Sequence, residues 1–149
     1  MNWLVDTSVL IGSVQKASIR RESAEEAVKA LRSRKGNLYI VPQNLIEFWA
    51  VATRPIEANG LGLSIKDAQN EIDRIKILFV LKSEDETIFD NWEKLVSEYS
   101  VIGKTTHDAR LVAAMQTHGI ENLLTFNVAD FKRYSGLISV STPHDFADN

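Results

Sequence analysis

A chain of 149 residues, 44% hydrophobic and 25% charged, has the length and composition of one globular domain with its own core. Its 17 Lys and Arg against 20 Asp and Glu give a formal net charge of −3, which excludes binding of nucleic acid through an overall positive field. The absence of Cys excludes disulfides and Cys-ligated metals, and no apolar run is long enough to span a membrane. We therefore expect a single domain over residues 1–149, located in the cytoplasm.

The first third of the chain alternates between strands and helices. Trp3–Val5 and Leu38–Val41 are short apolar runs without strict alternation, which is typical of strands buried on both faces. Ser23 and Glu26 form a capping box that predicts the start of a helix. The next helix ends before Pro55, because proline disfavours helix in the residue that precedes it. The apolar residues at helical spacing are Ala24, Ala27, Val28 and Leu31, followed by Leu45, Phe48, Trp49 and Ala52.

A flexible loop, a helix and a third strand are expected next. The loop is Asn59–Gly62, in which two glycines favour a turn. Ser64 and Asp67 predict the start of the helix. Its apolar residues at helical spacing are Ile65, Ala68, Ile72 and Ile75. The apolar run Leu78–Leu81 then predicts the third strand.

Two further helices are predicted between residues 83 and 119. Ser83 and Glu86 form the capping box of one helix. The other begins near Thr106 and ends at Gly119, since glycine favours the left-handed backbone that closes helices. Their apolar residues are Ile88, Trp92, Leu95 and Tyr99 in the first, and Leu111, Ala114 and Met115 in the second.

The end of the chain supplies two more strands, Asn122–Thr125 and Leu137–Val140, followed by an expected loose tail over residues 141–149. No internal repeat, low-complexity tract or linker rich in Gly or Pro divides the chain. Strands that alternate with helices predict a three-layer α/β domain with a mostly parallel sheet.

Four acidic residues lie at strand-to-helix junctions of this predicted sheet. Asp6 follows the first strand directly, and Glu47 lies in the first turns of the helix after the second strand. Asp108 lies at a helix start, and Asp130 follows the strand Asn122–Thr125 by a few residues. Ligands collect at the carboxyl ends of parallel strands, so we expect all four at one edge of the sheet.

Each acid alone also has a structural explanation. Asp6 suits the N-cap of a helix that begins near Thr7, and Glu47 suits a solvent-facing position. Asp108 and Asp130 both suit the positive end of a short or long helix. Together, however, four carboxylates would repel one another strongly without cations. Oxygen ligands without Cys favour Mg²⁺ or Mn²⁺, which bind phosphodiesters and activate water for hydrolysis.

The basic and histidine side chains are weaker indications of function than the acids. The basic runs Arg20-Arg21, Arg32–Lys35 and Lys132-Arg133 are interpreted as solvated helix faces. His107, His118 and His144 receive no catalytic role. Any positive surface for nucleic acid must therefore be local or supplied by bound cations.

The order and spacing of four segments resemble the PIN-domain ribonucleases, specifically the toxins of VapBC-type pairs. Each motif is short, but the ordered set covers nearly the whole chain. The segments are Leu4–Leu10, Ile40–Phe48, His107–Ala114 and Leu124–Phe131.

This resemblance implies an α/β/α sandwich with a parallel sheet of about five strands. It also implies a Mg²⁺-dependent endoribonuclease, the toxin of a type II toxin–antitoxin system, which hydrolyses RNA with metal-activated water. Asp6, Glu47 and Asp108 would hold the metal, with Mn²⁺ as a substitute. Asp130 would complete the site, and Asn127 is the alternative fourth ligand.

The resemblance extends to auxiliary residues and partners. Thr7 or Ser8 would orient Asp6 or reach the metal. A homodimer and an antitoxin that lays an apolar helix in a groove are expected. Phe48, Trp49 and Trp92 are candidate groove residues or, alternatively, core aromatics at helical spacing.

Two other functions remain open at this stage. The same acids would serve a DNA-directed or structure-specific nuclease, because contacts to the 2′-hydroxyl decide between RNA and DNA. A PIN-like fold kept as a non-catalytic protein-binding module is the second. The intact set of four acids argues against the binding module.

Overall fold

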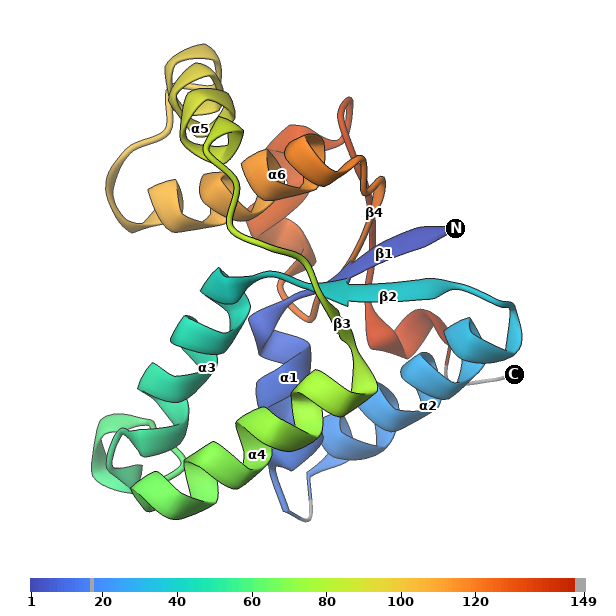
Figure 1. Ribbon diagram of the computed structural model, residues 1–149, viewed down its shortest axis with the longest axis vertical. Helices are drawn as coiled ribbons and strands as arrows, with labels where there is room; N and C mark the ends of the chain where they lie inside the picture. Colours follow the sequence, from blue (N-terminus) through green and yellow to red (C-terminus); the bar gives the residue numbers. More distant parts are fainter. Residues whose placement is uncertain (17, 147–149) are drawn as a thin grey trace.

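Five parallel strands run through the centre of the computed structural model, which describes residues 1–16 and 18–146 (Figure 1). The strands pair in the order β3-β2-β1-β4-β5, and each of the four pairings is parallel. Their bounds are Asn2–Val5 for β1, Asn37–Ile40 for β2, Val80–Leu81 for β3, Asn122–Leu124 for β4 and Ser139–Ser141 for β5.

Helices cover both faces of the sheet. The α-helices are α1 Thr7–Val14, α2 Ile19–Ser33, α3 Pro42–Thr53, α4 Ile65–Leu78, α5 Thr87–Glu98 and α6 Thr106–His118. Four short 3₁₀ segments are η1 Ile56–Ala58, η2 Gly103–Thr105, η3 Val128–Tyr134 and η4 Pro143–Phe146. In the described part of the chain, no helix is long and apolar enough to cross a membrane.

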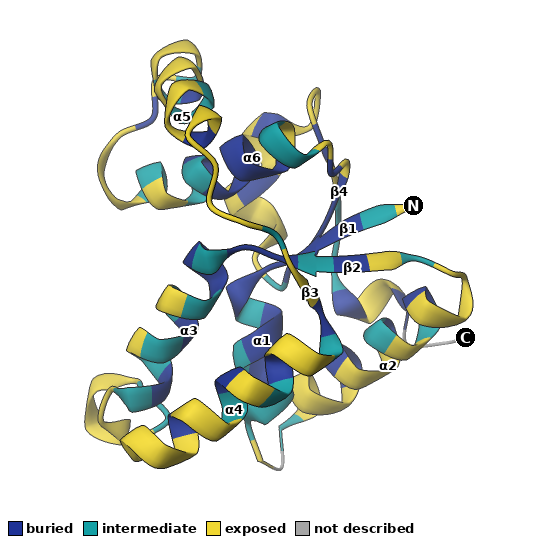
Figure 2. Ribbon diagram, viewed as in Figure 1, coloured by how far each residue is buried: buried dark blue, intermediate teal, exposed yellow. Residues whose placement is uncertain are grey.

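The central strand β1 shows how the sequence divides the core into two layers. Trp3 and Val5 pack on the face covered by α1, α2, α3 and α4. Leu4, between them, packs on the opposite face with α5, α6 and η3. Successive side chains of a strand point to opposite faces, so one apolar run serves both layers. Figure 2 shows the inward sides of the helices and most of the central strand β1 as buried, whereas the edge strand β3 is exposed. The predicted three-layer α/β/α fold is confirmed.

The connectivity creates one switch point. The chain leaves β1, adds β2 and β3 on one side, and then returns to place β4 on the other side of β1. Ligands of open parallel sheets bind where the strand order reverses, beyond the carboxyl ends of the strands. Here that place lies beyond Val5 of β1 and Leu124 of β4, which are paired.

Two predicted helix starts are wrong. Helix α2 begins four residues before Ser23, at Ile19, where the Ser18 hydroxyl accepts a hydrogen bond from the backbone of Arg20. Helix α5 begins at Thr87, where the Asp85 carboxylate accepts from the Thr87 backbone. In both places several residues could act as caps, and apolar spacing does not choose between them. The cap at Ser64 and the left-handed Gly119 after α6 are as predicted.

The strand boundaries differ slightly from those predicted. Leu78 ends α4 instead of beginning a strand, and β5 begins at Ser139 instead of Leu137. A continuous apolar run does not distinguish the last turn of a buried helix from the first residues of a strand. The edge strand β3 is therefore shorter than the sequence predicted.

The segment after α3 is a loop, as predicted, but backbone hydrogen bonds fasten it. The N–H groups of Gly60 and Gly62 donate to the carbonyls of Pro55 and Arg54. A Cβ on Gly60 would lie 2.0 Å from the Arg54 carbonyl oxygen, so only glycine fits there. The loop holds the end of α3, where Arg54 stands.

The expected loose tail is wrong for residues 141–146. Phe146 is 7% exposed and packs edge-on against Trp3, with ring centroids 6.0 Å apart. The backbone N–H of Thr142 donates to the Asp145 carboxylate, which closes η4. One buried aromatic ring anchors a segment whose overall composition is polar. Residues 147–149 lie outside the described part of the chain.

Candidate active site

Asp6 stands at the switch point between β1 and β4. Its backbone N–H donates to the Leu124 carbonyl at 2.9 Å, which continues the strand pairing by one residue. Its carboxylate oxygen Oδ2 accepts from the Thr125 hydroxyl at 2.7 Å and from the Ser8 hydroxyl at 2.9 Å. Asp6 occupies the N-cap position of α1, but its side chain makes no capping hydrogen bond there. The capping explanation for Asp6 is therefore excluded.

Both hydroxyl groups are oriented toward Asp6 by the backbone. The Ser8 oxygen accepts from the N–H of Phe126 at 3.1 Å, and the Thr125 oxygen accepts from the N–H of Asn127 at 2.9 Å. Each hydroxyl thus has its own proton available for the carboxylate. Burial nevertheless raises the pKa of Asp6, and the charge of Glu47 adds to this, while the Thr125 and Ser8 hydrogen bonds act in the opposite direction.

Glu47 is held by both of its carboxylate oxygens. Thr7 donates its hydroxyl proton to Oε1 at 2.7 Å, and the Gln43 amide donates to Oε2 at 3.2 Å. Thr7 in turn accepts from the Asn44 side chain at 3.3 Å. Asn44 is fixed because its own side-chain oxygen accepts from the Val41 backbone. The residues before and at the start of α3 therefore orient Glu47, which is half-buried and not freely solvated.

Asp108 lies in the first turn of α6 and is half-buried. Burial is the largest cause that raises its pKa, to about 6. The charges of Asp6, Asp130 and Glu47 raise it further, in that order of size, and His107 opposes them. The fold thus places all three other predicted acids within electrostatic reach of Asp108.

The two candidates for the fourth position lie in different places. Asn127 lines the same cleft as Asp6 and Asp108. Asp130 is exposed on η3, beside that cleft, and reaches Asp108 through its charge. The backbone N–H of Asp130 donates to the Asn127 carbonyl at 3.0 Å, so the two residues form one turn.

These residues surround a cleft of about 450 Å³. Its wall includes Asp6, Glu47, Asp108 and Asn127, together with the basic residues Arg20 and Arg54. The sequence interpretation assigned Arg20 to a solvated helix face and did not single out Arg54. The Arg20 guanidinium lies 4.8 Å from the centroid of the Phe126 ring, directly after Thr125. A basic residue in a polar run gives no sign that a distant strand end will contact it.

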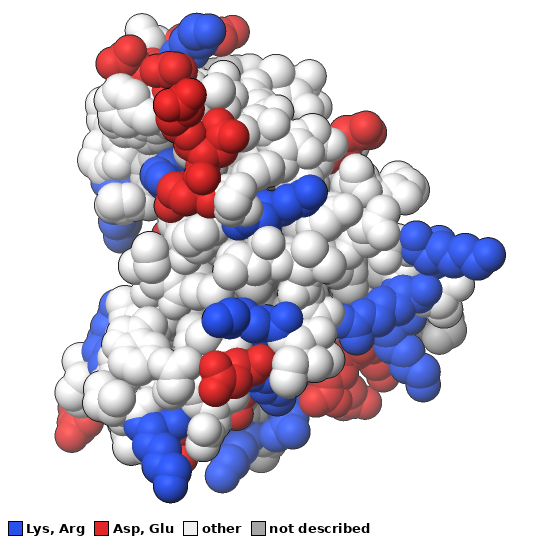
Figure 3. Space-filling model, viewed as in Figure 1, with Lys and Arg blue, Asp and Glu red and all other residues white. Residues whose placement is uncertain are grey.

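Charge is unevenly spread over the rest of the surface. In Figure 3, acidic side chains gather on the part of the molecule formed by α5, and basic side chains gather near α2 and the turn into β2. Arg32, Arg34 and Lys35 belong to this basic side and are exposed. The lining of the cleft itself combines acidic and basic residues, although the net charge of the chain is −3.

The chemistry of the donor set fits a hard divalent cation. Carboxylate and amide oxygens are the ligands that Mg²⁺ prefers, and a cation would offset the repulsion that raises the pKa of Asp108. Within residues 1–16 and 18–146, no three acidic or His side chains are close enough together to enclose one ion. The fit is therefore one of ligand type, and the acids would have to move closer together to enclose a cation.

The aromatic and His residues take mainly structural positions. Phe48 is fully buried, and Trp49 and Trp92 pack partly against the two cores, which agrees with the core alternative. The Trp92 ring N–H donates to the Thr106 carbonyl at 2.8 Å. His118 contacts the Ser83 carbonyl at 3.0 Å.

The fold and the site together define a class of protein, a parallel α/β/α domain with an acidic cleft at its switch point. Residues 3–137 match the family model of the PIN domain, and the chain belongs to the PIN domain family. The acids and the auxiliary Thr7 and Ser8 all lie within the matched region. No curated protein sequence matches the chain.

Solved structures with a similar fold include several toxin–antitoxin complexes. VapBC2 from Rickettsia felis, bound to a DNA fragment from its promoter, matches with a TM-score of 0.71, 16% identity, and coverage of 95% of this chain and 98% of that chain. VapC20 from Mycobacterium tuberculosis, described as a Sarcin–Ricin loop cleaving toxin, has a TM-score of 0.63, 20% identity and coverage of 93% and 98%. A toxin–antitoxin complex from Klebsiella pneumoniae has a TM-score of 0.61, 24% identity and coverage of 94% and 96%. At these identities the likeness shows the fold.

Proposed function

We propose that this PIN-domain protein is a Mg²⁺-dependent endoribonuclease and the toxin of a type II toxin–antitoxin pair. The observation that carries the proposal is the electrostatic coupling of Asp108 to Asp6, Glu47 and Asp130 beside one cleft. These acids come from four separate parts of the chain, and bringing their negative charges together is unfavourable unless a cation binds.

The proposed ligands are Asp6, Glu47 and Asp108, with Asp130 or Asn127 as the fourth. Two hydroxyl groups fix Asp6, and Thr7 with Gln43 fixes Glu47. A bound Mg²⁺ would lower the pKa of water and offset negative charge on a phosphodiester. Mn²⁺ would act as a substitute because it has similar oxygen-ligand chemistry.

In this proposal water is the nucleophile, and the hydroxyls of the cleft orient the metal ligands. Thr7 and Ser8 both donate their protons to proposed ligands, Thr7 to Glu47 and Ser8 to Asp6. Arg20 and Arg54 stand in the cleft wall, where they would bind phosphate oxygens of the substrate. In-line attack by water would leave a 5′-phosphate and a 3′-hydroxyl.

The toxin assignment is supported by likeness in fold. The similar structures include VapBC and FitAB complexes, and one similar toxin is described as cleaving the Sarcin–Ricin loop. By extension, an antitoxin partner, a homodimer and action on RNA in the cytoplasm belong to the proposal. Co-purification with the product of a neighbouring gene would test the antitoxin, and analytical ultracentrifugation would test the dimer.

The direct test is incubation of the purified protein with total cellular RNA in Mg²⁺. We expect discrete fragments that disappear with EDTA and with Asp6→Asn. Asp73→Asn removes an exposed carboxylate on α4 and is the matched control, which should cut like the wild type. Cleavage of DNA instead of RNA would contradict the ribonuclease assignment. Loss of both cleavage and metal binding would favour a protein-binding module.

A further inference from the structure

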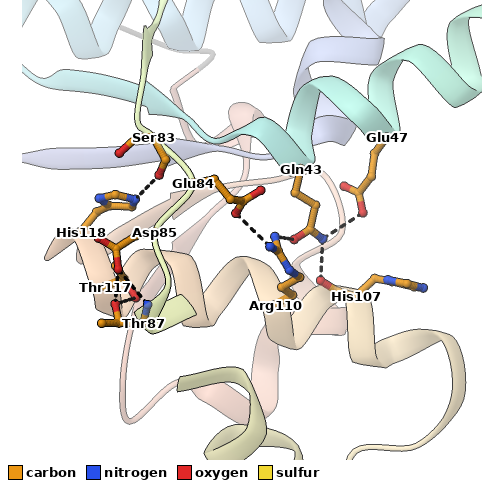
Figure 4. A network of polar contacts seen from close by, with 10 residues as sticks. All are labelled: Gln43, Glu47, Ser83, Glu84, Asp85, Thr87, His107, Arg110, Thr117 and His118. Carbon is orange, nitrogen blue, oxygen red and sulfur yellow. Dashed lines mark hydrogen bonds and ion pairs between the residues drawn. The ribbon is translucent and has the colours of Figure 1, made fainter. Parts of the chain in front are cut away.

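Gln43 makes three side-chain contacts that use all the hydrogen-bonding groups of its amide except one lone pair. It is the second residue of α3 and is 7% exposed. Its Nε2 donates to the His107 carbonyl at 2.8 Å and to Glu47 Oε2 at 3.2 Å. Its Oε1 accepts from Arg110 Nη1 at 3.2 Å. Figure 4 shows the amide lying between these three partners.

The partners permit only one orientation of this amide. The side that faces Glu47 and His107 meets two acceptors, a carboxylate and a carbonyl, so it must carry the NH₂ group. The side that faces Arg110 meets a guanidinium, which only donates, so it must carry the oxygen. A reversed amide would lose all three hydrogen bonds. The donors and acceptors around the Gln43 amide therefore fix its orientation.

This amide joins the two layers that supply the acids. Glu47 stands on α3, whose buried residues belong to the core on one face of the sheet. His107 precedes Asp108 on α6, which packs on the other face. Gln43 thus bridges the layers at the edge of the sheet where Glu47 and Asp108 meet the cleft. A change in the bridge would alter the position of Glu47 relative to Asp108.

An ion pair anchors the far end of the bridge. Arg110 Nη2 lies 2.8 Å from Glu84 Oε1, and the same guanidinium donates to Gln43 through Nη1. Glu84 lies between β3 and α5. The contacts form a chain from Glu84 through Arg110 and Gln43 to Glu47, as Figure 4 shows.

We propose that Gln43 is a positioning residue, which holds Glu47 in the geometry needed to bind a divalent cation, and that Arg110 holds Gln43. The inference rests on the proposed function and assigns the part of the chain that orients its metal ligand. Groups that orient a ligand side chain typically change metal affinity or activity by about 10–100-fold when they are removed.

The test is isothermal titration of Mn²⁺ into wild type and Gln43→Met. Methionine keeps the approximate volume but has no amide, so we expect about tenfold weaker binding. The matched control is Gln69→Met on α4, because Gln69 also donates to a carboxylate four residues on, Asp73, at 3.0 Å. It should bind Mn²⁺ within about twofold of wild type. Melting temperatures measured in EDTA show whether each variant is folded.

Arg110→Met is the second variant, because it leaves Gln43 and removes only its anchor. We expect a smaller loss of Mn²⁺ affinity, about threefold, against no change in the control Arg74→Met, which breaks the ion pair with Glu71 on α4. This variant keeps the inference testable if Gln43→Met does not fold. Folded Gln43→Met and Arg110→Met proteins that bind Mn²⁺ as tightly as wild type would overturn the inference.

A crystal structure of Gln43→Met, or of Arg110→Met if the first does not fold, separates this inference from the proposed function. If wild type binds no divalent ion, the proposed function fails, and the position of Glu47 still decides the role of the bridge. We expect Glu47 to shift and its contact with Thr7, now 2.7 Å, to lengthen or break. A Glu47 side chain that stays in place would overturn the positioning role.

Discussion

The two halves of the acidic cleft are built differently. Asp6 and Glu47 each accept two side-chain hydrogen bonds, from Ser8 and Thr125 in one case and from Thr7 and Gln43 in the other. Among residues 1–16 and 18–146, no side chain donates a hydrogen bond to the carboxylates of Asp108 and Asp130. Asp6 and Glu47 form the fixed half of the site, because side-chain hydrogen bonds hold their carboxylates. Asp108 and Asp130 form the open half, in which only the backbone positions the carboxylates.

The difference shows where a cation would have its largest effect. Hydrogen bonds to a carboxylate favour its charged form, and they partly oppose the effect of burial at Asp6. At Asp108 charge repulsion adds to burial, and the pKa rises to about 6. We therefore expect the fixed half to hold its geometry without metal, and the open half to gain order when metal binds. Five substitutions test this comparison.

The largest effect is expected for Asp6→Asn, which removes a carboxylate from the fixed half. Because asparagine has nearly the same shape, the fold should persist, while cleavage of RNA should fall at least about a hundredfold, more than for an orienting residue. Cleavage rates in Mg²⁺ and a melting curve in EDTA measure the two effects. Asp73→Asn is the control, since Asp73 is exposed on α4. A folded Asp6→Asn protein with wild-type rate would refute the assignment.

Asp108→Asn tests the open half, with a comparable loss of cleavage but a gain in stability in EDTA. The folded-state pKa, about 6, lies above the ordinary 3.8, so the folded protein binds this proton more tightly. The resulting stability is complete below about pH 3.8 and is lost as the pH rises through 6. At pH 7 the substitution should stabilise by about 1 kcal/mol, after discounting for solvent screening, or raise Tm by about 2–4 °C.

The same experiment gives a pH signature. Between pH 4 and 6.5, the free energy of unfolding of Asp108→Asn in EDTA should fall less with rising pH than that of wild type. This range begins near the ordinary pKa of Asp108, 3.8, and ends about half a unit above its folded-state pKa of about 6. Denaturant titrations at several pH values measure it. Parallel pH profiles for the two proteins would show that the pKa of Asp108 is not raised in the folded protein.

Thr125→Val probes the support of the fixed half and is expected to have a smaller effect. Valine keeps the shape but removes the donor to Asp6 and the acceptor for the Asn127 N–H. We expect a loss of about 1–2 kcal/mol of stability and about tenfold in cleavage. Thr53→Val on α3 is the control, because its hydroxyl only donates to the Trp49 carbonyl of the same helix. Equal effects in the two variants would mean that Thr125 has no special role.

The sequence predicted the positions of the acids better than it predicted the residues that orient them. Asp6 could be found because it follows an apolar strand, and parallel strands end at one edge of a sheet. Thr125 could not, because its partner Asp6 lies 119 residues away and no local spacing marks such a contact. Gln43 lies four residues before Glu47, at helical spacing, but its contact with His107 spans 64 residues and has no local mark. The fold class followed from alternating periodicities, which many residues share. The predicted starts of individual helices were wrong because nearby polar residues compete for the capping position, as Ser18 and Ser23 do.

The smallest effect is expected for Asp130→Asn, which decides how the open half is completed. Asp130 is exposed and lies beside the cleft, whereas Asn127 lines it. If Asp130 acts mainly through its charge, the substitution should lower cleavage only a few-fold, on the order expected for a group outside the ligand set. It should also lower the pKa of Asp108, because the charge of Asp130 raises that pKa. NMR titration of the Asp108 carboxyl in EDTA measures the shift.

Asn127→Ala provides the matched comparison at the other candidate position. A larger loss of cleavage and Mn²⁺ affinity in Asn127→Ala than in Asp130→Asn would assign the fourth ligand to Asn127. The reverse order would assign it to Asp130, and would mean that η3 moves toward the cleft when metal binds, since Asp130 now lies outside the wall. Because the Asp130 N–H bonds to the Asn127 carbonyl, such a movement would carry both residues together. The open half of the site would then close as a unit around the cation, while Asp6 and Glu47 remain fixed.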